Sequence, residues 1–213
     1  MGDRICPVCS NLAFQRLKKG SVQYWQCSNC KMLYCDPLDQ DGLVGGGNEI
    51  PRNEQQNHLR IERLDMLFKG KNRADLNVLD FGCGHGMLVN DLSKAGYATE
   101  GYDAYNEDFS RLPGKNKFDA VTCVETLEHT SFPFPEIEVV YRSLKKYGIF
   151  YVETSFVDVA EQEGIELEDF EYINTEVGHC TIFSHHAMDL LMVGRGFKVG
   201  RHFNRHARIY YKA

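Results

Sequence analysis

The spacing of apolar positions divides most of the chain into alternating helices and strands. Residues 54–70 and 87–96 place apolar side chains at helical spacing, and residues 136–147 form a third helical stretch that ends at a turn around Gly148. Short apolar runs between these stretches have the length of buried strands. Alternating helices and strands predict an α/β fold around a mostly parallel sheet. The predicted strands are residues 78–81, 98–103, 117–124, 149–154, 197–204 and 208–213.

The first part of the chain carries two Cys-x-x-Cys pairs, Cys6 with Cys9 and Cys27 with Cys30. Seventeen residues separate the pairs, a spacing typical of a four-cysteine zinc ribbon. Each pair presents two thiolates from one tight turn, and two turns complete a tetrahedron around zinc. A redox-active dithiol would need only one pair, so zinc is the better interpretation. Because four cysteines would fill the coordination sphere, the zinc is structural, and residues 1–37 form a zinc-ribbon module.

Charge and composition limit the ligands that the chain can bind and the compartment in which it is found. The formal net charge of −6 argues against a protein that wraps nucleic acid through broad phosphate contacts. No apolar stretch approaches the length of a membrane span, and paired cysteines indicate metal binding in a reducing compartment, so the cytoplasm is the expected location. Residues 38–52 are rich in glycine and lack periodicity, which predicts a linker to a second domain, residues 53–213.

The segment LNVLDFGCGHGMLVND joins a predicted strand, a glycine-rich turn and a helix. Glycines in such a turn let the backbone pass close to a ligand, as nucleotide-binding loops require. The dinucleotide fingerprint needs Gly or Ala where Met87 stands, and the spacing here is instead Asp-x-Gly-x-Gly-x-Gly. In this motif the chain resembles the class I S-adenosylmethionine-dependent methyltransferases. The motif comprises Asp80, Gly82, Gly84 and Gly86.

The resemblance continues from the linker to the end of the chain and implies a Rossmann-like, seven-stranded methyltransferase sheet that binds S-adenosylmethionine. It implies that the glycine turn wraps the methionine half of the cofactor and that Asp80 anchors its amino-acid end. Asp103 follows the second predicted strand, where a carboxylate can accept the ribose hydroxyls. Only fifteen positions separate Asp103 from Phe118, so the region of the third strand should be abbreviated. Asp108 and Phe109 are the candidates for adenine contacts.

Glu125, Glu128 and His129 follow a predicted strand at spacing i, i+3 and i+4, which would place them on one face of a helix. At the carboxyl end of that strand they would face the ligand crevice of an α/β sheet. Glu125 would then contact the cofactor. Glu128 and His129 leave three interpretations open: a capping pair, a general base at His129, or ligands for a divalent cation such as Mg²⁺ or Mn²⁺. His179 is a candidate further ligand or base, if the preceding segment folds back over the pocket.

The Glu-x-x-Glu-His pattern with a later histidine resembles two metal-dependent groups of methyltransferases, the O-methyltransferases of the ubiquinone pathway and the enzymes that modify the 3′ ends of small RNAs. A zinc ribbon ahead of such a domain also resembles bacterial methyltransferases of small molecules and surface glycans. Eight carboxylates in residues 157–176 disfavour an anionic acceptor such as RNA. We therefore expect O-methylation of a small molecule or glycan precursor, with His129 and His179 or a divalent cation activating the acceptor.

Two other functions fit the same residues. One is methylation of RNA, at a ribose 2′ oxygen or at a base, for which Arg195, Arg201, Arg205 and Arg208 would offer a local basic patch. Methyltransferases of ribosomal RNA bases also begin with a cysteine-rich module, but with a different ligand spacing. The other is an adaptor whose zinc ribbon and methyltransferase fold bind cofactor without catalysis.

Overall fold

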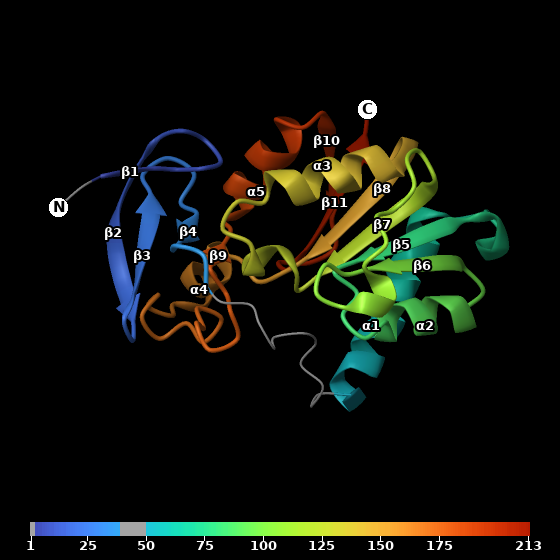
Figure 1. The fold of residues 1–213 in the computed structure, drawn as a ribbon, viewed down its shortest axis with the longest axis horizontal. Coiled ribbons are helices and arrows are strands. Elements are labelled where there is room, and N and C mark those ends of the chain that lie inside the picture. The colour runs from blue at the N-terminus through green and yellow to red at the C-terminus, as the bar shows by residue number, and fades with distance from the viewer. Residues whose placement is uncertain (1–2, 39–49) are drawn as a thin grey trace.

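A computed structural model describes residues 3–38 and 50–213 of the chain (Figure 1). These residues form a six-stranded sheet flanked by helices and a five-stranded sheet near the N-terminus. The predicted linker, residues 38–52, lies mostly outside the described residues, and helix α1 (Ile50–Leu67) begins within its last three positions. The division into residues 1–37 and 53–213 stays a prediction.

The larger sheet confirms the predicted α/β fold. Its strand order is β10-β11-β8-β7-β5-β6, in which β6, β5, β7 and β8 are parallel neighbours and β11 runs antiparallel to both β8 and β10. The sheet therefore ends in the antiparallel pair that the last two apolar segments predict. The strands are β5 (Asn77–Phe81), β6 (Ala98–Tyr102), β7 (Phe118–Val124), β8 (Leu144–Glu153), β10 (Phe197–His202) and β11 (Ala207–Lys212).

Between β6 and β7 the chain forms no further strand. Residues 103–117, all of them described, contain a single 3₁₀ turn, η2 (Glu107–Phe109), and otherwise irregular backbone. β6 is therefore the edge of the sheet. The strand that is absent from the seven-stranded arrangement is the third, for which the sequence provides too few residues. A cavity of about 480 Å³ opens at this edge, beside Phe109.

Helices cover both faces of the larger sheet (Figure 1). Helices α1 and α2 (Met87–Lys94) pack on the face that includes Val78, and α3 (Phe134–Ser143) and α5 (His185–Val193) pack on the face that includes Leu79. Neighbouring strand residues point to opposite faces, so burial on both faces explains why the parallel strands are apolar without alternation. None of the described helices is long and apolar enough to cross a membrane.

One predicted boundary is wrong. Gly148 does not separate a helix from a strand, because β8 begins directly after α3 and includes Gly148. The pairing of β7 with β8 shifts register near this point, which accommodates the irregular first residues of β8. Among the described residues, the remaining helical elements are the 3₁₀ turns η1 (Arg73–Asp75) and η3 (Leu127–His129) and helix α4 (Val157–Glu163), which follows β8.

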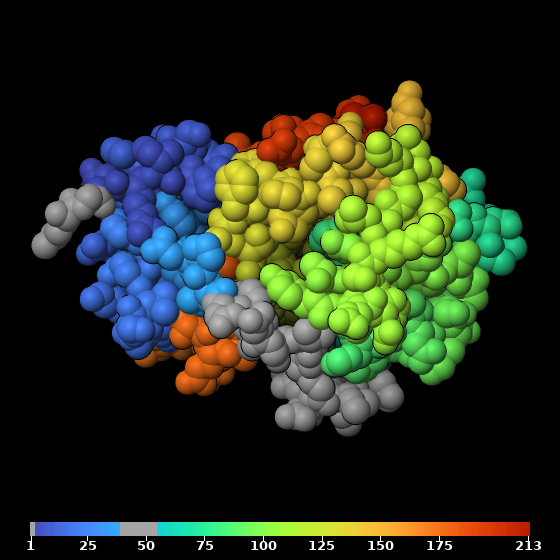
Figure 2. Space-filling view, viewed as in Figure 1, coloured from blue at the N-terminus to red at the C-terminus, as the bar shows by residue number. Residues whose placement is uncertain are grey.

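The smaller sheet combines the zinc-ribbon segment with a strand from far along the chain. Its order is β1-β2-β3-β4-β9, and β9 belongs to the predicted methyltransferase domain. Buried Tyr24 and Ile182 lie in one continuous apolar core with the α3 and α5 face of the larger sheet. Figure 2 shows the blue N-terminal segment in contact with the orange part of the chain. Arg16 of the N-terminal segment pairs with Glu168 at 2.7 Å. The strands are β1 (Arg4–Ile5), β2 (Leu12–Lys19), β3 (Val22–Cys27), β4 (Leu33–Tyr34) and β9 (Thr181–Ile182).

Candidate functional site

A glycine-rich turn follows the carboxyl end of β5. Its backbone conformation is one that glycine adopts more readily than any other residue. Gly82, Gly84 and Gly86 have φ angles of +77°, +54° and +75°, all in the left-handed region. A side chain at Gly82 would also collide with Thr126, which follows β7. Helix α2 begins directly after Gly86, so its first amide groups face the turn. The predicted strand, glycine turn and helix are all present.

Asp80, the first residue of the motif, lies below this turn with only 4% of its surface exposed. The Thr122 hydroxyl donates a hydrogen bond to its carboxylate at 2.8 Å. Burial raises the pKa of Asp80 to about 6, although the Thr122 hydrogen bond and the Arg60 guanidinium act in the opposite direction. The structure therefore places Asp80 as a buried support of the turn, with Arg60 as its nearby positive charge.

Asp103 follows β6 and contacts the glycine turn directly. Its Oδ2 accepts a hydrogen bond from the Gly84 amide at 2.8 Å, and its Oδ1 accepts one from the Tyr105 amide at 2.9 Å. Asn106 donates from Nδ2 to the Gly84 carbonyl at 2.7 Å. Asp103, the predicted ribose contact, is thus held at the rim of the glycine turn. This turn is the part of the chain predicted to wrap the methionine half of the cofactor.

The two adenine candidates occupy different places. Phe109 lies against the glycine turn, since a Cβ atom at Gly86 or at Gly101 would come within 2.7 Å of its ring. Asp108 is exposed on the η2 turn, where its backbone amide donates to Asn106 at 3.0 Å. The fold therefore brings Phe109 to the cofactor loop and leaves Asp108 at the surface.

Glu125, Glu128 and His129 do not share the face of a helix, so this prediction is wrong. Glu125 directly follows β7 with a φ angle of +47°, which is uncommon for a residue other than glycine. Only Leu127–His129 are helical, in a single 3₁₀ turn, η3. A 3₁₀ turn has three residues per turn and ends too soon to align side chains at i, i+3 and i+4.

Tyr172 connects the two glutamates instead. Its hydroxyl donates to Glu125 at 2.8 Å and lies 2.8 Å from the Thr154 hydroxyl, which donates to Glu128 at 3.1 Å. Glu125 is open to a cavity but sits deep among protein atoms, and this desolvation together with the Glu128 carboxylate raises its pKa. Burial also raises the pKa of Glu128.

Glu128, His129 and His179 bring their ligand atoms within 4.8 Å of one another. The two imidazole rings lie 4.9 Å apart, edge to face. The segment before His179 does fold back over the pocket, because its Tyr172 donates to Glu125. Directly after His179, the Cys180 amide donates to the Glu128 carbonyl at 2.9 Å. His179 Nδ1 lies 2.8 Å from the Tyr172 carbonyl and donates to it, so Nε2 carries the lone pair.

Two buried atoms of this cluster, Glu128 Oε1 and His129 Nδ1, have no hydrogen-bond partner among the described residues. Burial lowers the pKa of His129 to about 4, with a further contribution from His179, and burial also lowers the pKa of His179. Both imidazoles are therefore neutral at pH 7 and can offer lone pairs. Unsatisfied buried ligand atoms, a carboxylate and two neutral imidazoles form a donor set that fits a divalent cation.

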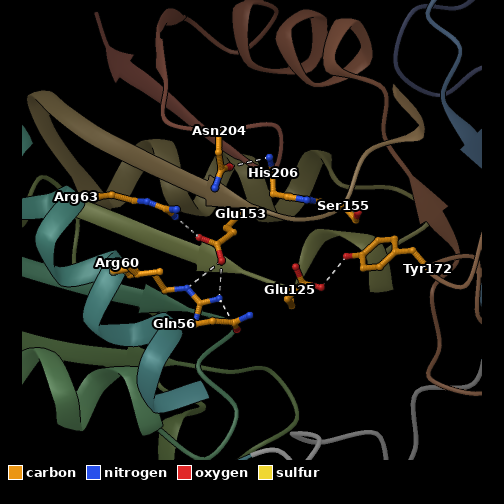
Figure 3. Close-up of a pocket in the computed structure, with 10 residues that line it drawn as sticks. Gln56, Arg60, Arg63, Glu125, Glu153, Ser155, Tyr172, Asn204 and His206 are labelled. Carbon is orange, nitrogen blue, oxygen red and sulfur yellow. Dashed lines mark hydrogen bonds and ion pairs between the residues drawn. The ribbon is translucent and has the colours of Figure 1, made fainter. Parts of the chain in front are cut away.

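A cavity of about 510 Å³ opens beside Tyr172 at the carboxyl ends of β7 and β8 (Figure 3). On its α1 side, Arg60 reaches Glu153 Oε1 at 2.5 Å and Arg63 reaches Glu153 Oε2 at 3.0 Å. The two guanidiniums outweigh the desolvation of Glu153 and keep its pKa below the usual range. Glu125 lines the same cavity, so the cavity's two arginines face two carboxyl groups. The other polar lining residues include Gln56, Ser155, Asn204 and His206.

Sequence reasoning missed Arg60, Arg63, Asn106 and Tyr172. Charged residues in an amphipathic helix such as α1 usually mark a solvated face, yet Arg60 is only 6% exposed. Tyr172 lies in the acidic insertion, where no periodic pattern separates a ligand contact from a surface loop. Only the burial of these side chains, which requires the tertiary structure, identifies them.

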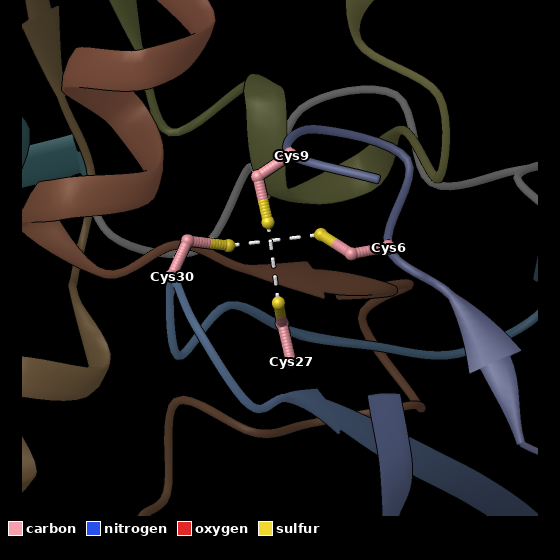
Figure 4. Close-up of side chains that lie close together, drawn as sticks. All are labelled: Cys6, Cys9, Cys27 and Cys30. Carbon is pink, nitrogen blue, oxygen red and sulfur yellow. Dashed lines mark hydrogen bonds between the residues drawn. The ribbon is translucent and has the colours of Figure 1, made fainter. Parts of the chain in front are cut away.

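The four predicted zinc ligands converge (Figure 4). Cys6 Sγ lies 3.6 Å from Cys30 Sγ, Cys9 Sγ lies 3.3 Å from Cys27 Sγ, and all four sulfurs lie within 4.8 Å of one another. Zinc–sulfur bonds of about 2.3 Å give a tetrahedron with edges of about 3.8 Å, so the sulfurs stand close to the positions of a zinc site. All eight cysteines are free thiols.

The C-terminal arginines do not gather into one basic surface. Arg208 is buried and pairs with Asp189 at 3.0 Å, and Arg205 pairs with Glu163 at 2.5 Å. Each pair neutralises a charge that the RNA interpretation would need.

Comparison with known sequences agrees with the glycine motif. A family model described as "Methyltransferase domain" matches residues 52–202. The ubiquinone biosynthesis O-methyltransferase of Colwellia psychrerythraea is 28% identical over 120 residues, which cover 45% of this chain and 47% of that protein. The chain spans about half the length of the curated relatives it matches.

Comparison with solved structures agrees with the fold. The 1,6-didemethyltoxoflavin-N1-methyltransferase of Burkholderia thailandensis, solved with 1,6-didemethyltoxoflavin and S-adenosylhomocysteine, aligns with a TM-score of 0.59 at 12% identity, over 93% of this chain and 99% of that one. A SAM-dependent methyltransferase of Methanosarcina mazei aligns with a TM-score of 0.50 at 18% identity, over 69% of this chain and 96% of that one. At these identities the likeness shows the fold alone.

Proposed function

The chain belongs to the class I S-adenosylmethionine-dependent methyltransferases, and from this premise we propose that it transfers a methyl group from S-adenosylmethionine to a hydroxyl oxygen of a polar small molecule or glycan precursor. The observation that carries the proposal is the cluster of Glu128, His129 and His179, with two unpartnered buried ligand atoms. This cluster is joined through Tyr172 to a cavity with a polar lining. It lies at the carboxyl edge of the sheet, where α/β folds bind ligands.

The cofactor would be held around the glycine turn. Asp103, at the rim of this turn, would accept the ribose hydroxyls, and the Phe109 ring against Gly86 would provide an apolar face for adenine. The guanidiniums of Arg60 and Arg63, which line the cavity, would suit the carboxylate at the methionine end. Glu125, at the end of β7, would contact the cofactor from the acceptor side.

Glu128, His129 and His179 would hold a divalent cation, Mg²⁺ or Mn²⁺. When bound, such a cation is a Lewis acid that lowers the pKa of an acceptor hydroxyl. The chain itself orients the ligands. The Tyr172 carbonyl accepts a hydrogen bond from His179 Nδ1, and the Thr154 hydroxyl donates to Glu128 Oε2 and leaves Oε1 available.

A general base at His129 is less well supported. Proton removal is most efficient when the pKa of the base is near the working pH. Burial lowers the pKa of His129 to about 4, so its imidazole would accept a hydroxyl proton poorly. The related ubiquinone biosynthesis proteins are named O-methyltransferases, which agrees with an oxygen acceptor.

A polar, uncharged acceptor fits the cavity better than RNA does. The cavity is lined mostly by side chains that donate or accept hydrogen bonds. The acidic residues 157–176 lie on its Tyr172 side, and two of the C-terminal arginines are already paired. We also assign one structural zinc to Cys6, Cys9, Cys27 and Cys30, on the convergence of their sulfurs.

The test is a methyl-transfer screen of glycans, quinols, small amines and short RNAs. We expect transfer to a hydroxylated acceptor that EDTA abolishes and that Mg²⁺ or Mn²⁺ restores without added zinc. Glu128→Gln and His179→Asn should remove this transfer, and His186→Asn, a change at an exposed position of α5, should not.

Other outcomes contradict parts of the proposal. If EDTA does not affect transfer and only His129→Asn abolishes it, His129 acts as a general base and the proposed cation is wrong. Transfer that survives all the cluster variants would remove these residues from the reaction. Failure to bind S-adenosylmethionine or its demethylated product would contradict the whole proposal.

A further inference from the structure

One peptide group connects the zinc ribbon with the candidate cation site. It is the peptide between His179 and Cys180: its carbonyl accepts a hydrogen bond from the Tyr24 hydroxyl at 2.5 Å, and its amide donates to the Glu128 carbonyl at 2.9 Å. The C=O and N–H of a planar trans peptide point in opposite directions. A ribbon side chain and the backbone of Glu128 therefore hold opposite sides of the same peptide plane.

The neighbouring residues extend this connection on both sides. On the ribbon side, the Cys35 amide donates to the Cys180 carbonyl at 2.9 Å, and the Ser184 hydroxyl donates to the carbonyl of Cys30, a predicted zinc ligand. On the other side, the Thr181 hydroxyl donates to the Thr130 carbonyl at 2.7 Å. Strand β9 is thus hydrogen bonded to β4 of the ribbon and to the segment that carries Glu128.

Tyr24 is suited to a fixed role in this connection. It is fully buried in the shared core, and burial raises its pKa, so the hydroxyl stays a donor at neutral pH. The His179 ring is held at Nδ1 by the Tyr172 carbonyl, and its backbone is held by Tyr24. Ligand geometry must be correct to within about 0.5 Å, so a shift of this backbone would reach the imidazole nitrogen.

We propose that Tyr24 is a positioning residue for His179 and that the zinc ribbon is thereby a structural part of the acceptor site. The inference rests on the proposed cation site and goes beyond it, because it assigns the geometry of that site to a module at the other end of the sequence. If the ribbon were only an independent folding unit, the buried Tyr24 hydroxyl would not need to bind the His179 carbonyl.

The test compares Tyr24→Phe with Tyr34→Phe. Both changes remove one buried or nearly buried ribbon hydroxyl, but Tyr34 donates to the Ile5 carbonyl within the ribbon, at 3.2 Å. Mn²⁺ affinity is measured by electron paramagnetic resonance, S-adenosylhomocysteine affinity by calorimetry, and exchange of the Cys180 amide by hydrogen–deuterium exchange. Thermal unfolding checks that both variants fold.

We expect Tyr24→Phe to weaken Mn²⁺ binding by about five- to tenfold and to speed exchange at Cys180 by about the same factor. Tyr34→Phe should leave both within about twofold, and S-adenosylhomocysteine affinity should be unchanged in both variants. Equal losses in the two variants, or no loss in either, would overturn the inference.

The two proposals fail in different ways. If the wild-type chain binds no Mn²⁺, the proposed cation site is wrong, and the exchange measurement alone decides the role of Tyr24. Faster exchange at Cys180 in Tyr24→Phe but not in Tyr34→Phe would then support the positioning of this segment by Tyr24. Unchanged exchange in Tyr24→Phe would overturn it.

Discussion

The cofactor half of the site and the acceptor half draw on very different lengths of chain. The cofactor half is built from residues 77–109, and its contact between Gly84 and Asp103 joins positions 19 apart. The acceptor half draws on four separate segments, which contain Tyr24, Glu128, Thr154 and His179. Its contact between Tyr24 and His179 joins positions 155 apart.

This difference affects how each half responds to change. The cofactor half depends on backbone conformations that a short motif imposes, such as the left-handed glycines of the turn. The acceptor half depends on the docking of the ribbon, the acidic insertion and α5 around β7. We therefore expect distant substitutions to impair methyl transfer while leaving cofactor affinity intact.

The largest effect is expected for Cys27→Ser, which removes one of the four proposed zinc ligands. Zinc contributes about 10–16 kcal/mol to the folding of small zinc modules, so the ribbon should lose its structure, and β9 should lose its partner β4. Zinc content and methyl transfer should fall to background, whereas S-adenosylhomocysteine affinity should stay within about twofold in calorimetry. Ser28→Ala, at the next position of the same turn, is the control. Loss of cofactor binding in Cys27→Ser would show that the halves are not separable.

The next largest effect is expected for Glu153→Gln, because Glu153 connects β8 with helix α1. Its carboxylate pairs with Arg60 and Arg63 of α1, and the side chains of Arg60 and Glu153 are only 7% and 13% exposed. Removal of one partner from a buried ion pair costs about 3–5 kcal/mol, and we expect a value near the lower end in denaturant unfolding.

Glu163→Gln is the matched control for this buried pair. Glu163 pairs with Arg205 at the surface, where the side chains are 35% and 47% exposed. A surface pair contributes about 0–1 kcal/mol, so this variant should unfold like the wild type. Equal losses in the two variants would contradict the structural importance of Glu153.

Asp103→Asn should affect the cofactor half alone. Loss of a charged acceptor for the ribose hydroxyls should weaken S-adenosylhomocysteine binding by about ten- to a hundredfold, measured by calorimetry. Mn²⁺ affinity should be unchanged, since Asp103 is not part of the candidate cation site. Asp108→Asn, at an exposed position of the same segment, should have no effect on either ligand. A loss of Mn²⁺ binding in Asp103→Asn would contradict the independence of the cofactor half and the acceptor half.

The smallest effect is expected for Tyr172→Phe. The substitution removes the hydroxyl between Glu125 and Thr154 and should lower the free energy of unfolding by about 1 kcal/mol. Methyl transfer should fall several-fold with cofactor affinity unchanged. Tyr105→Phe removes a hydroxyl from a side chain that is 60% exposed and serves as the control. An unchanged rate in Tyr172→Phe would leave this hydrogen-bond chain without a part in the reaction.

Much of the fold follows from local patterns. Buried parallel strands are apolar on both faces, so their number and order along the chain are visible as short apolar runs. The fourteen residues between Asp103 and Phe118 leave no room for a third strand. The register of β8 was not predictable in this way, because the irregular pairing around Gly148 depends on β7. The helical spacing of Glu125, Glu128 and His129 failed for a related reason: the strand exit at Glu125 adopts a left-handed conformation that spacing does not reveal.

What the sequence alone determined is chemistry that lies within a few neighbouring positions: the glycine turn, whose φ angles few other residues tolerate, and the two Cys-x-x-Cys turns, whose sulfurs need only a second pair to form a tetrahedron. Only the tertiary structure decided that Arg60 and Arg63 enclose Glu153, that Tyr172 joins Glu125 to Thr154, and that β9 completes the ribbon sheet. These contacts arise when segments far apart in the chain share one core. Burial then selects the partners of each polar group, and no local pattern of residues records that choice.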